Sequence, residues 1–463
     1  MVCLLIVACS GPPSTPEPRP KPERPNLLLI SIDSLRSDHL GLYGYSRNTS
    51  PVIDRLGREG VFFSQALAPS SWTLPSHATL FTGQPPRQHG VDAHNRGLSP
   101  EAVTLAEVLK AAGYRTAAFV SGPFLGGVYG FTRGFDVYDE STIGDEQTVH
   151  RAATSPRLEK LASTWLEESL DQHPQSPFFV FLHMWDPHHD YARRESEDPA
   201  FDPDYEGDLS GEDIIKDPRF NADMPARDLE HVIALYDEEI RYTDRHIGSI
   251  VELLRRRGVL DDTIVVVTSD HGEEFFEHGQ RTHSNNLHDE VLRIPLVIRY
   301  PPRIAAGLEV ERQVRLMDVA PTVLGLAGVS GRESLGTGSN SQHRERDLTP
   351  WITGAETPDS FPELLSFAHM TNNGLQGSVR SEKLKVIFRY KRGPVTTEVY
   401  DLEADPGEQS QLPSAQRRSR EVRKMIAEAL AWDRRWRNRP APSQDLKVDE
   451  DQMQRLRVLG YVE

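Results

Sequence analysis

Cysteine is nearly absent from this chain of 463 residues, and both of its cysteines, Cys3 and Cys9, lie within the first nine residues. The rest of the chain therefore forms no internal disulfide and no metal site built on thiolates. Positive charge is also scarce, since 52 Lys and Arg stand against 69 Asp and Glu, a formal net charge of −17. Without a basic stripe, the sequence argues against nucleic-acid binding. An anionic substrate would instead need a local positive centre, for which a metal ion is the obvious candidate.

Long apolar runs are missing at the start of the chain as well. Residues 1–9 are apolar but too few to span a bilayer. Their end, residues 6–9 (IVAC), resembles a bacterial lipobox, in which the last cysteine is lipidated and becomes the mature N-terminus. Residues 10–25 are rich in proline and poor in apolar side chains, as in an extended linker. We expect a lipid anchor at Cys9 and a place in the bacterial cell envelope, in the periplasm or at the cell surface; an ordinary signal peptide is the alternative.

Strand-like and helix-like segments alternate after this linker. Helices are predicted at 104–112 and 228–257, where apolar residues recur at helical spacing and a glycine follows. Alternation of this kind is typical of an α/β fold with a mostly parallel sheet. The polar run 186–227 is expected to be a surface insertion over the site. Buried strands are predicted where the chain is almost wholly apolar, at 27–32, 116–120, 177–185, 263–268 and 294–299.

The pattern changes toward the C-terminus. Residues 378–388 and 396–402 alternate as the strands of a hairpin do, and the run 401–408 leads into a charged helix. We expect a catalytic domain at 26–365 and a small α+β subdomain at 366–463.

Polar side chains directly follow two predicted strands. Asp33 comes after 27–32, and Asp270 with His271 comes after 263–268. In open α/β sheets, ligands bind outside the carboxyl ends of the strands, so we expect these side chains near a site. Thr73 precedes Pro75, which suits the first position of a short helix. Free N–H groups at such a helix start favour an anionic group.

Together, Asp33, Thr73, Asp270 and His271 offer oxygen donors and one imidazole, a plausible set for one divalent ion. Calcium, manganese, zinc and magnesium all remain candidates. Such an ion would lower the pKa of the Thr73 hydroxyl and polarise an oxygen of a bound substrate. Taken singly, each residue also has an ordinary structural interpretation, such as a helix cap for Thr73 or an Asx turn for Asp33.

Two segments carry a family resemblance. Residues 68–83 (APSSWTLPSHATLFTG) resemble the nucleophile loop of the sulfatase and alkaline-phosphatase superfamily, where Cys/Ser-x-Pro-x-Arg precedes a helix ending Leu-x-Thr-Gly. Residues 400–408 (YDLEADPGE) are similar to the sulfatase C-terminal subdomain. The resemblance covers nearly everything after residue 25. It implies an α/β/α sandwich with a mostly parallel sheet, and a hydrolase acting on a sulfate or phosphate ester.

The resemblance also implies roles for individual residues. Thr73 takes the nucleophile position, with Ser70, Ser71 and Ser76 close by. His77 stands where sulfatases carry an arginine, and is expected to bind substrate. His188 and His283 match positions that contact substrate, and either could be the general acid. As in phosphodiesterases of the superfamily, a second metal could instead be held by His183, Asp186, His188 and His283.

Departures from the sulfatase pattern remove positive and oxidisable groups. Ser34 replaces the second aspartate of a metal-binding pair, and residues 120–123 (VSGP) lack the family's lysine. Thr73 cannot supply formylglycine, because oxidation of its secondary alcohol gives a ketone. This favours phosphoryl transfer through a phospho-threonine. An envelope phosphotransferase or phosphodiesterase and a non-catalytic binding protein are the alternatives; substrate identity and oligomeric state are left open.

Overall fold

The computed structural model describes residues 22–144, 153–188, 190–191, 200–331, 335, 346–357, 365–371, 375–390, 395–437 and 443–458. The expected anchor segment, 1–9, and residues 10–21 of the expected linker lie outside the described residues. Within the described ranges, no helix is both long and apolar enough to cross a membrane.

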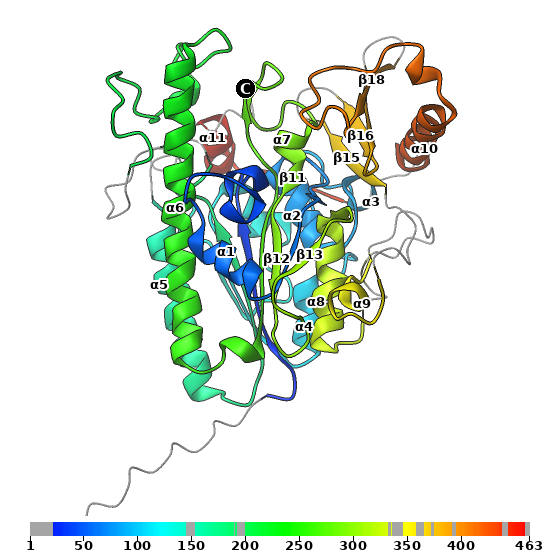
Figure 1. Cartoon of the computed structure of the whole chain (residues 1–463). Coiled ribbons are helices and arrows are strands. Elements are labelled where there is room, and N and C mark those ends of the chain that lie inside the picture. Colours follow the sequence, from blue (N-terminus) through cyan, green and yellow to red (C-terminus); the bar gives the residue numbers. More distant parts are fainter. Residues whose placement is uncertain are drawn as a thin grey trace, which may run out of the picture.

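One eight-stranded sheet forms the centre of the molecule (Figure 1). Its strands lie in the order β13 (Leu308–Val310), β2 (Val61–Phe63), β12 (Leu296–Arg299), β8 (Thr263–Ser269), β1 (Asn26–Ile32), β7 (Phe178–Met184), β5 (Arg115–Phe119) and β6 (Val137–Asp139). β1 pairs in parallel with both β7 and β8, whereas β12 is antiparallel to β8 and β2. The sheet is therefore mostly parallel, as predicted; the sequence did not reveal the reversed direction of β12.

Helices cover both faces of this sheet (Figure 1). Leu27 and Leu29 of β1 join one apolar cluster, whereas Leu28 and Ile30 join the other. Burial on both faces explains why the strand reads as an unbroken apolar run, and the α/β/α sandwich is confirmed. The first cluster contains α2 (Thr73–Thr82), α4 (Leu105–Ala111) and α8 (Val319–Ala327), and the second contains α1 (Pro51–Arg58), α5 (Ser155–Gln172) and α6 (Ala226–Arg256).

Shorter elements complete the large domain. β3 (Ala66–Leu67) pairs with β11 (Arg293–Ile294) and β14 (Val314–Arg315), and β9 (Glu274–Phe275) pairs with β10 (Arg281–Thr282). The short helices are α3 (Pro86–His89), α7 (Asp289–Leu292) and α9 (Thr349–Ile352). Single 3-10 turns lie at Ser37–His39, Gly41–Tyr43, Pro123–Leu125, Gly127–Tyr129, Ile214–Lys216, Leu260–Asp262, Leu316–Asp318 and Gln416–Arg418.

A second, antiparallel sheet contains β15 (Ser366–Met370), β16 (Gln376–Arg380), β17 (Leu384–Arg389) and β18 (Thr396–Asp401). The predicted strand 378–388 is wrong as one element, because the chain turns between β16 and β17, where the Ser381 N–H donates to the Leu384 carbonyl. The charged helix α10 (Arg420–Arg437) begins well after residue 408 and packs Val422 and Met425 into the apolar cluster of this sheet.

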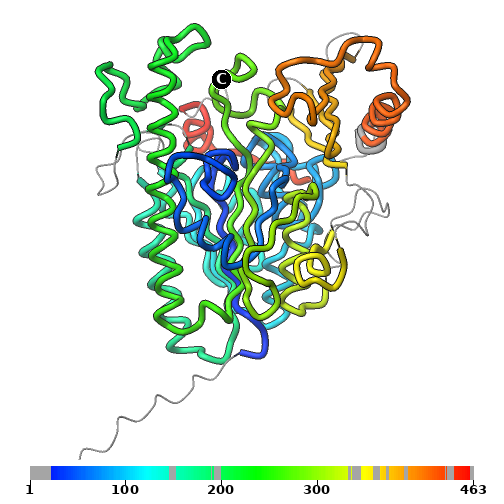
Figure 2. Tube along the Cα trace, in the orientation of Figure 1, coloured from blue at the N-terminus to red at the C-terminus, as the bar shows by residue number. Residues whose placement is uncertain are grey.

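The last described residues return to the large domain, as the red part of the trace in Figure 2 shows. β19 (Gln444–Asp445) pairs with β4 (Arg96–Gly97), and Leu456 of α11 (Glu450–Val458) joins the cluster that contains α2. The unit formed by the β15–β18 sheet therefore ends with α10, because the residues after α10 pack against the large domain. The predicted domain boundaries stay predictions.

Candidate active site

Asp33, Thr73, Asp270 and His271 meet at one end of the sheet. β1 and β8 are parallel neighbours, so the residues that follow them leave the sheet side by side. The Thr73 Oγ1 lies 3.4 Å from Asp33 Oδ2 and 3.3 Å from His271 Nε2. All four side chains are buried. The strand ends and the start of α2 therefore bring together the four residues predicted as ligands; their roles remain predictions.

The His271 ring is turned so that Nε2 faces the carboxylates. Its Nδ1 donates to the Gly272 carbonyl at 2.9 Å, which leaves a lone pair on Nε2, 3.4 Å from Asp270 Oδ2 and 3.8 Å from Asp33 Oδ1. Residue 272 has no room for a side chain, because a Cβ there would lie 2.1 Å from the Glu290 carbonyl oxygen. A histidine fixed at one nitrogen, with the other facing carboxylates, is a usual arrangement around a metal ion.

Two buried polar atoms at this centre lack a hydrogen-bond partner within the described part of the chain, Asp270 Oδ2 and His183 Nε2. The His183 Nδ1 donates to the Ser121 carbonyl at 2.5 Å, so its Nε2 also presents a lone pair, 3.3 Å from Asp33 Oδ2. A buried acceptor without a donor costs about 1–3 kcal/mol, which a bound cation would offset. The residues present therefore fit a divalent ion, and their oxygen and imidazole donors suit manganese or zinc.

The carboxylates differ in their electrostatics. Burial raises the pKa of the Asp33 carboxyl, but a hydrogen bond from His183 and positive charge on His188 and His271, when these rings are protonated and no cation is bound, outweigh burial and hold this pKa well below its usual range. With the rings neutral, a bound cation would take over that role. Burial and then the charge of Asp33 raise the pKa of Asp270. Two adjacent buried carboxylates resist carrying full negative charge together, and a divalent cation would relieve that repulsion.

Ser34, which replaces an expected aspartate ligand, links the two carboxylates instead. Its hydroxyl donates to Asp33 Oδ1 at 2.8 Å, and its N–H donates to Asp270 Oδ1 at 3.3 Å. Its φ of 57° turns both groups toward the centre. The side chain therefore orients acidic ligands rather than adding one.

Two of the three hydroxyls close to Thr73 in sequence are engaged elsewhere, whereas the buried Ser70 Oγ has no hydrogen-bond partner within the described ranges. The Ser71 Oγ is directed at Met370 Sδ, and the Ser76 Oγ donates to the Ser70 carbonyl. α2 begins at Thr73, so Pro75 is its third residue rather than its first, and the Thr73 hydroxyl lies at the helix N-terminus facing Asp33. This geometry supports Thr73 as the candidate nucleophile.

His77 does not face an open binding site. Its Nδ1 donates to the Thr73 carbonyl at 2.9 Å, and its Nε2 lies 3.0 Å from the Ser31 hydroxyl. Burial and the neighbouring His183 lower its pKa to about 3. A neutral, buried imidazole with both nitrogens engaged cannot replace a substrate-binding arginine, so the structure argues against that predicted role. His77 instead fixes the first turn of α2.

His283 lies beside the centre, with its ring centroid 4.4 Å from that of His271. Its Nδ1 is 3.1 Å from Glu273 Oε1, and the Tyr191 hydroxyl donates to Glu273 Oε2 at 2.8 Å. Burial lowers the pKa of His283, but the charge and hydrogen bond of Glu273, together with the charges of Asp33 and Asp270, outweigh burial and raise it. Glu273 was not predicted as a site residue; its position two residues after His271 was the only signal.

His188 also lies near the centre, whereas Asp186 does not take part. The His188 ring stacks on Trp185 with centroids 3.7 Å apart, and its centroid is 5.0 Å from that of His283. The Asp186 carboxylate accepts the N–H groups of Thr154 and Ser155, at 2.7 and 2.8 Å, and so anchors the start of α5. The alternative second-metal set thereby loses its only carboxylate.

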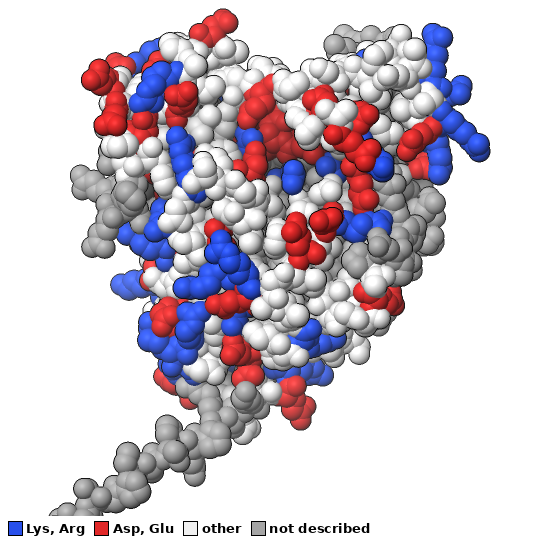
Figure 3. Space-filling view, viewed as in Figure 1, with Lys and Arg blue, Asp and Glu red and all other residues white. Residues whose placement is uncertain are grey.

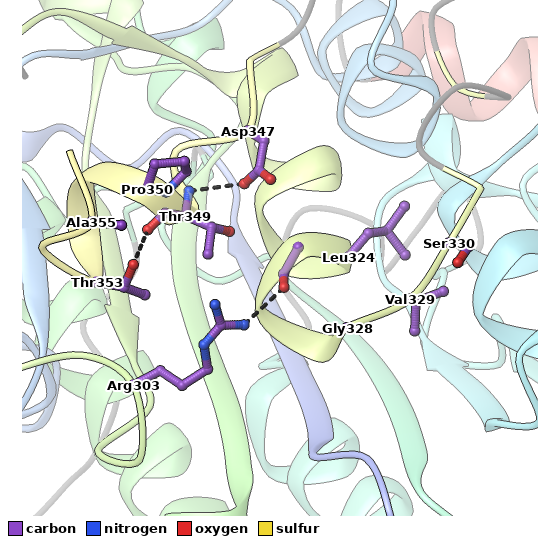
Figure 4. A pocket seen from close by; sticks show the side chains of 11 residues that line it. Arg303, Leu324, Gly328, Val329, Ser330, Asp347, Thr349, Pro350, Thr353 and Ala355 are labelled. Carbon is purple, nitrogen blue, oxygen red and sulfur yellow. Dashed lines mark hydrogen bonds between the residues drawn. The ribbon is translucent and has the colours of Figure 1, made fainter. Parts of the chain in front are cut away.

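A separate pocket of about 650 Å³ lies between α8 and α9 (Figure 4). Arg303 there donates to the carbonyls of Gly325 and Leu326, and Asp347 accepts the Thr349 N–H. Its charged side chains thus hold neighbouring backbone in place, and none of the predicted site residues lines it. The pocket is therefore not assigned to the chemistry.

Comparison with protein families gives two matches. Residues 25–329 match the family described as Sulfatase, and residues 277–435 match the family described as N-sulphoglucosamine sulphohydrolase, C-terminal. Relatives include an ulvan-active sulfatase of Formosa agariphila, 26% identical over 71% of this chain and 66% of that protein. Mouse steryl-sulfatase is 26% identical over 95% of this chain and 86% of its own length.

Solved structures share the fold at lower identity. One, in complex with D-glucosamine-2-N,6-O-disulfate, has a TM-score of 0.69 and 20% identity, and covers 91% of this chain and 99% of its own. The phosphonate monoester hydrolase of Agrobacterium radiobacter has a TM-score of 0.68 and 22% identity, and covers 92% of this chain and 98% of its own.

Proposed function

The chain belongs to the sulfatase family, and from that premise we propose that it is a metal-dependent ester hydrolase with Thr73 as its nucleophile. Membership makes it a hydrolase of ester bonds; the nucleophile, the metal and the class of ester are the proposal. The carrying observation is the Thr73 hydroxyl at the start of α2, 3.4 Å from Asp33 and 3.3 Å from His271.

Attack begins at the Thr73 hydroxyl. A divalent ion bound by Asp33, Asp270 and His271 would lower the pKa of this hydroxyl and polarise the ester. The Thr73 hydroxyl loses its proton to solvent when the ion is bound, and the Oγ1 alkoxide then forms a bond to the phosphorus while the bond to the leaving oxygen breaks. N–H groups at the start of α2 favour the anionic ester. The departing oxygen takes a proton from His283, whose protonated form Glu273 favours, and His188 is the second candidate acid.

Water completes the cycle by attack on the phosphorus of phospho-Thr73. The Thr73 Oγ1–P bond breaks, inorganic phosphate leaves, and a proton from the water returns to His283. A sulfo-threonine has no comparable exit, because threonine lacks the second hydroxyl with which an aldehyde hydrate expels sulfate. We therefore propose that phosphorus esters are turned over faster than sulfate esters. The fold shared with a phosphonate monoester hydrolase supports this preference, and the sulfatase relatives support sulfate esters as the alternative.

A sugar ester is the substrate class that we propose. One relative of Bacteroides thetaiotaomicron, 23% identical over 89% of this chain, is an N-acetylglucosamine-6-O-sulfatase, and another relative is an ulvan-active sulfatase. A structure of the same fold holds a sulfated glucosamine.

The direct test combines metal analysis with parallel assays of nitrophenyl sulfate, phosphate, phosphodiester and phosphonate. About one divalent ion per chain is expected, with turnover lost on chelation and regained on metal return. Thr73→Ala should lose roughly a thousandfold or more in kcat, as expected for a missing nucleophile. Ser76→Ala, one turn further along α2, is the matched control and should keep its turnover. Full activity in metal-free protein, or sulfate esters as the better substrates, would contradict the proposal.

We also propose that the protein is lipid-anchored in the bacterial envelope. The support is the residue 6–9 motif and the proline-rich run behind it. Cys9→Ser should move the protein from the membrane to the soluble fraction, and the mature wild-type chain should begin at Cys9. Unchanged partitioning together with another mature N-terminus would contradict the anchor.

A further inference from the structure

The outward face of α10 carries four exposed cations, Arg420, Arg423, Lys424 and Arg434. At about 100° per residue, they lie within an arc of about 100° around the helix. The only other residues in this arc are Ala427 and Ala431. We call these four cations the basic face of α10.

The rest of the helix explains why the basic face points to solvent. Val422, Met425, Ala429 and Trp432 project from the opposite side into the apolar cluster of the β15–β18 sheet. This packing fixes the rotation of the helix about its axis. The basic face is therefore a rigid surface rather than a set of charges on a loop.

The charges of the basic face are poorly compensated. Among the described residues, no carboxylate lies within ion-pairing distance of Arg420, Arg423 or Arg434, and Lys424 has Glu428 only at 3.8 Å. Several exposed cations elsewhere have closer partners, such as Asp217 for Arg219, Asp202 for Arg227 and Glu403 for Lys383. A concentrated positive surface on a chain of net charge −17 would attract an anionic partner.

The basic face lies on the part of the molecule that borders the nucleophile loop. α10 packs on the β15–β18 sheet, and β15 of this sheet contacts the nucleophile loop. There the His369 N–H donates to the Pro69 carbonyl, and the Ser71 Oγ meets Met370 Sδ. Figure 3 shows Lys and Arg atoms gathered at the upper right, over α10. From residue 420 to residue 434 the helix rises about 21 Å, which matches an extended chain rather than a single anion.

We propose that the basic face of α10 is a docking surface for a linear polyanionic polysaccharide, whose esters the buried centre hydrolyses. The identification of this polymer as the substrate rests on the proposed function. Regularly spaced anionic groups of the polymer would pair with the cations along the whole helix and release their counterions. Ala427 and Ala431 leave room for the polymer to approach the helix closely. A membrane is the less favoured partner. The proposed lipid anchor precedes β1, and β1 begins at the opposite end of the molecule from α10 (Figure 1).

Binding of dextran sulfate to the full chain tests the proposal, with neutral dextran as the uncharged control. The test variant carries Arg420→Gln, Arg423→Gln, Lys424→Gln and Arg434→Gln. The matched control carries Arg55→Gln, Lys110→Gln, Arg255→Gln and Lys383→Gln, four exposed cations with acidic neighbours and the same total charge change. The test variant should bind at least about tenfold more weakly, with a salt slope smaller by about three, while the control variant should bind like wild type.

Three results would overturn the proposal. One is an equal loss in both variants, which would reflect net charge alone. Another is wild-type binding no stronger to dextran sulfate than to neutral dextran. The third is tighter binding to phosphatidylglycerol vesicles that disappears in the test variant, which would assign the face to a membrane. If a thermal melt shows that the fourfold variant is unfolded, Arg420→Gln and Arg423→Gln are measured as single variants. Each should reduce the salt slope of dextran sulfate binding by about one. The readout is binding rather than turnover, so this proposal and the proposed hydrolysis fail separately.

Discussion

At the scale of single residues, the candidate active site depends on partners that fix one side of each imidazole. The Gly272 carbonyl holds His271, and the Ser121 carbonyl holds His183, so that each ring turns its other nitrogen to the centre. Glu273 has the equivalent part for His283, but as a carboxylate it also favours the protonated ring. The first two rings therefore suit metal binding and the third suits proton donation.

This division predicts the effect of Glu273→Gln. Esters with poor alkoxide leaving groups should lose about 100-fold in kcat, because their departure needs a proton from His283, whereas nitrophenyl esters should lose less than about threefold. Tyr191→Phe removes the hydroxyl on the other Glu273 oxygen and should show a small effect that does not depend on the leaving group. The measurement is kcat across an alkyl and nitrophenyl ester series. Equal losses for both leaving groups in Glu273→Gln would contradict His283 as the acid.

The sequence was informative for residues whose position follows from the strands. Asp33 and Asp270 each follow an apolar run, and a parallel sheet brings such positions together. Glu273 was missed because its contact with His283 depends on the path of the chain between them, which no periodicity describes. His77 was misread because the resemblance placed it at an arginine position, whereas its contacts with Ser31 and the Thr73 carbonyl lie within the core.

At the scale of elements, α6 holds the start of α1 through one buried side chain. The Asp244 carboxylate accepts the N–H groups of Val52 and Ile53, each at 2.9 Å. Burial raises the pKa of Asp244 to about 7, although these two N–H groups and Arg241 lower it. The charged form is therefore disfavoured where the helices meet.

The stability of the fold should depend on pH through Asp244. Its folded-state pKa lies above the unfolded value, so its contribution is fully present below about pH 4 and is lost as the pH rises through about 7. The Asp244→Asn variant keeps one of the two side-chain oxygens that accept these N–H groups, and its amide does not titrate. Over this pH range, the unfolding free energy of wild type should fall by roughly 2–4 kcal/mol relative to Asp244→Asn. Denaturant unfolding at several pH values measures the difference, and parallel curves for the two proteins would refute this assignment.

Elements were easier to predict than their directions and ends. The long helix was predicted at 228–257 and found at Ala226–Arg256, because its apolar residues repeat over many turns. β12 was located by its apolar run, but the run itself has no direction. The turn between β16 and β17 was missed because Ser381, Glu382 and Lys383 do not interrupt the alternation strongly.

At the scale of the whole molecule, buried ion pairs join the β15–β18 sheet to the large domain. The Lys385 ammonium, on β17, lies 2.7 Å from Asp289 of α7 in the large domain and 3.0 Å from Glu408. Arg380 of β16 also reaches Asp289, at 3.0 Å. The Lys385 side chain is completely buried, so its removal would leave Glu408 without its ammonium partner, while Asp289 would keep Arg380.

Lys385→Met should therefore destabilise the protein by about 3–5 kcal/mol, as expected for breaking a buried ion pair on one side. Lys383→Met, two residues earlier, is the matched control, because Lys383 is exposed and its ammonium pairs with the exposed Glu403. The control should change stability by less than about 1 kcal/mol. Thermal and denaturant unfolding measure both variants. Similarly small losses of stability in Lys385→Met and Lys383→Met would show that Lys385 does not hold the β15–β18 sheet to the large domain.

The central claim is that Thr73 becomes covalently modified during turnover. Protein mixed with a phosphate ester is quenched in acid, digested and examined by mass spectrometry for phosphorylated peptides. The account predicts phosphate on Thr73 in wild type and in Ser76→Ala, and no phosphorylated peptide from this loop in Thr73→Ala. Phosphate on another residue, or wild-type turnover in Thr73→Ala, would contradict the account.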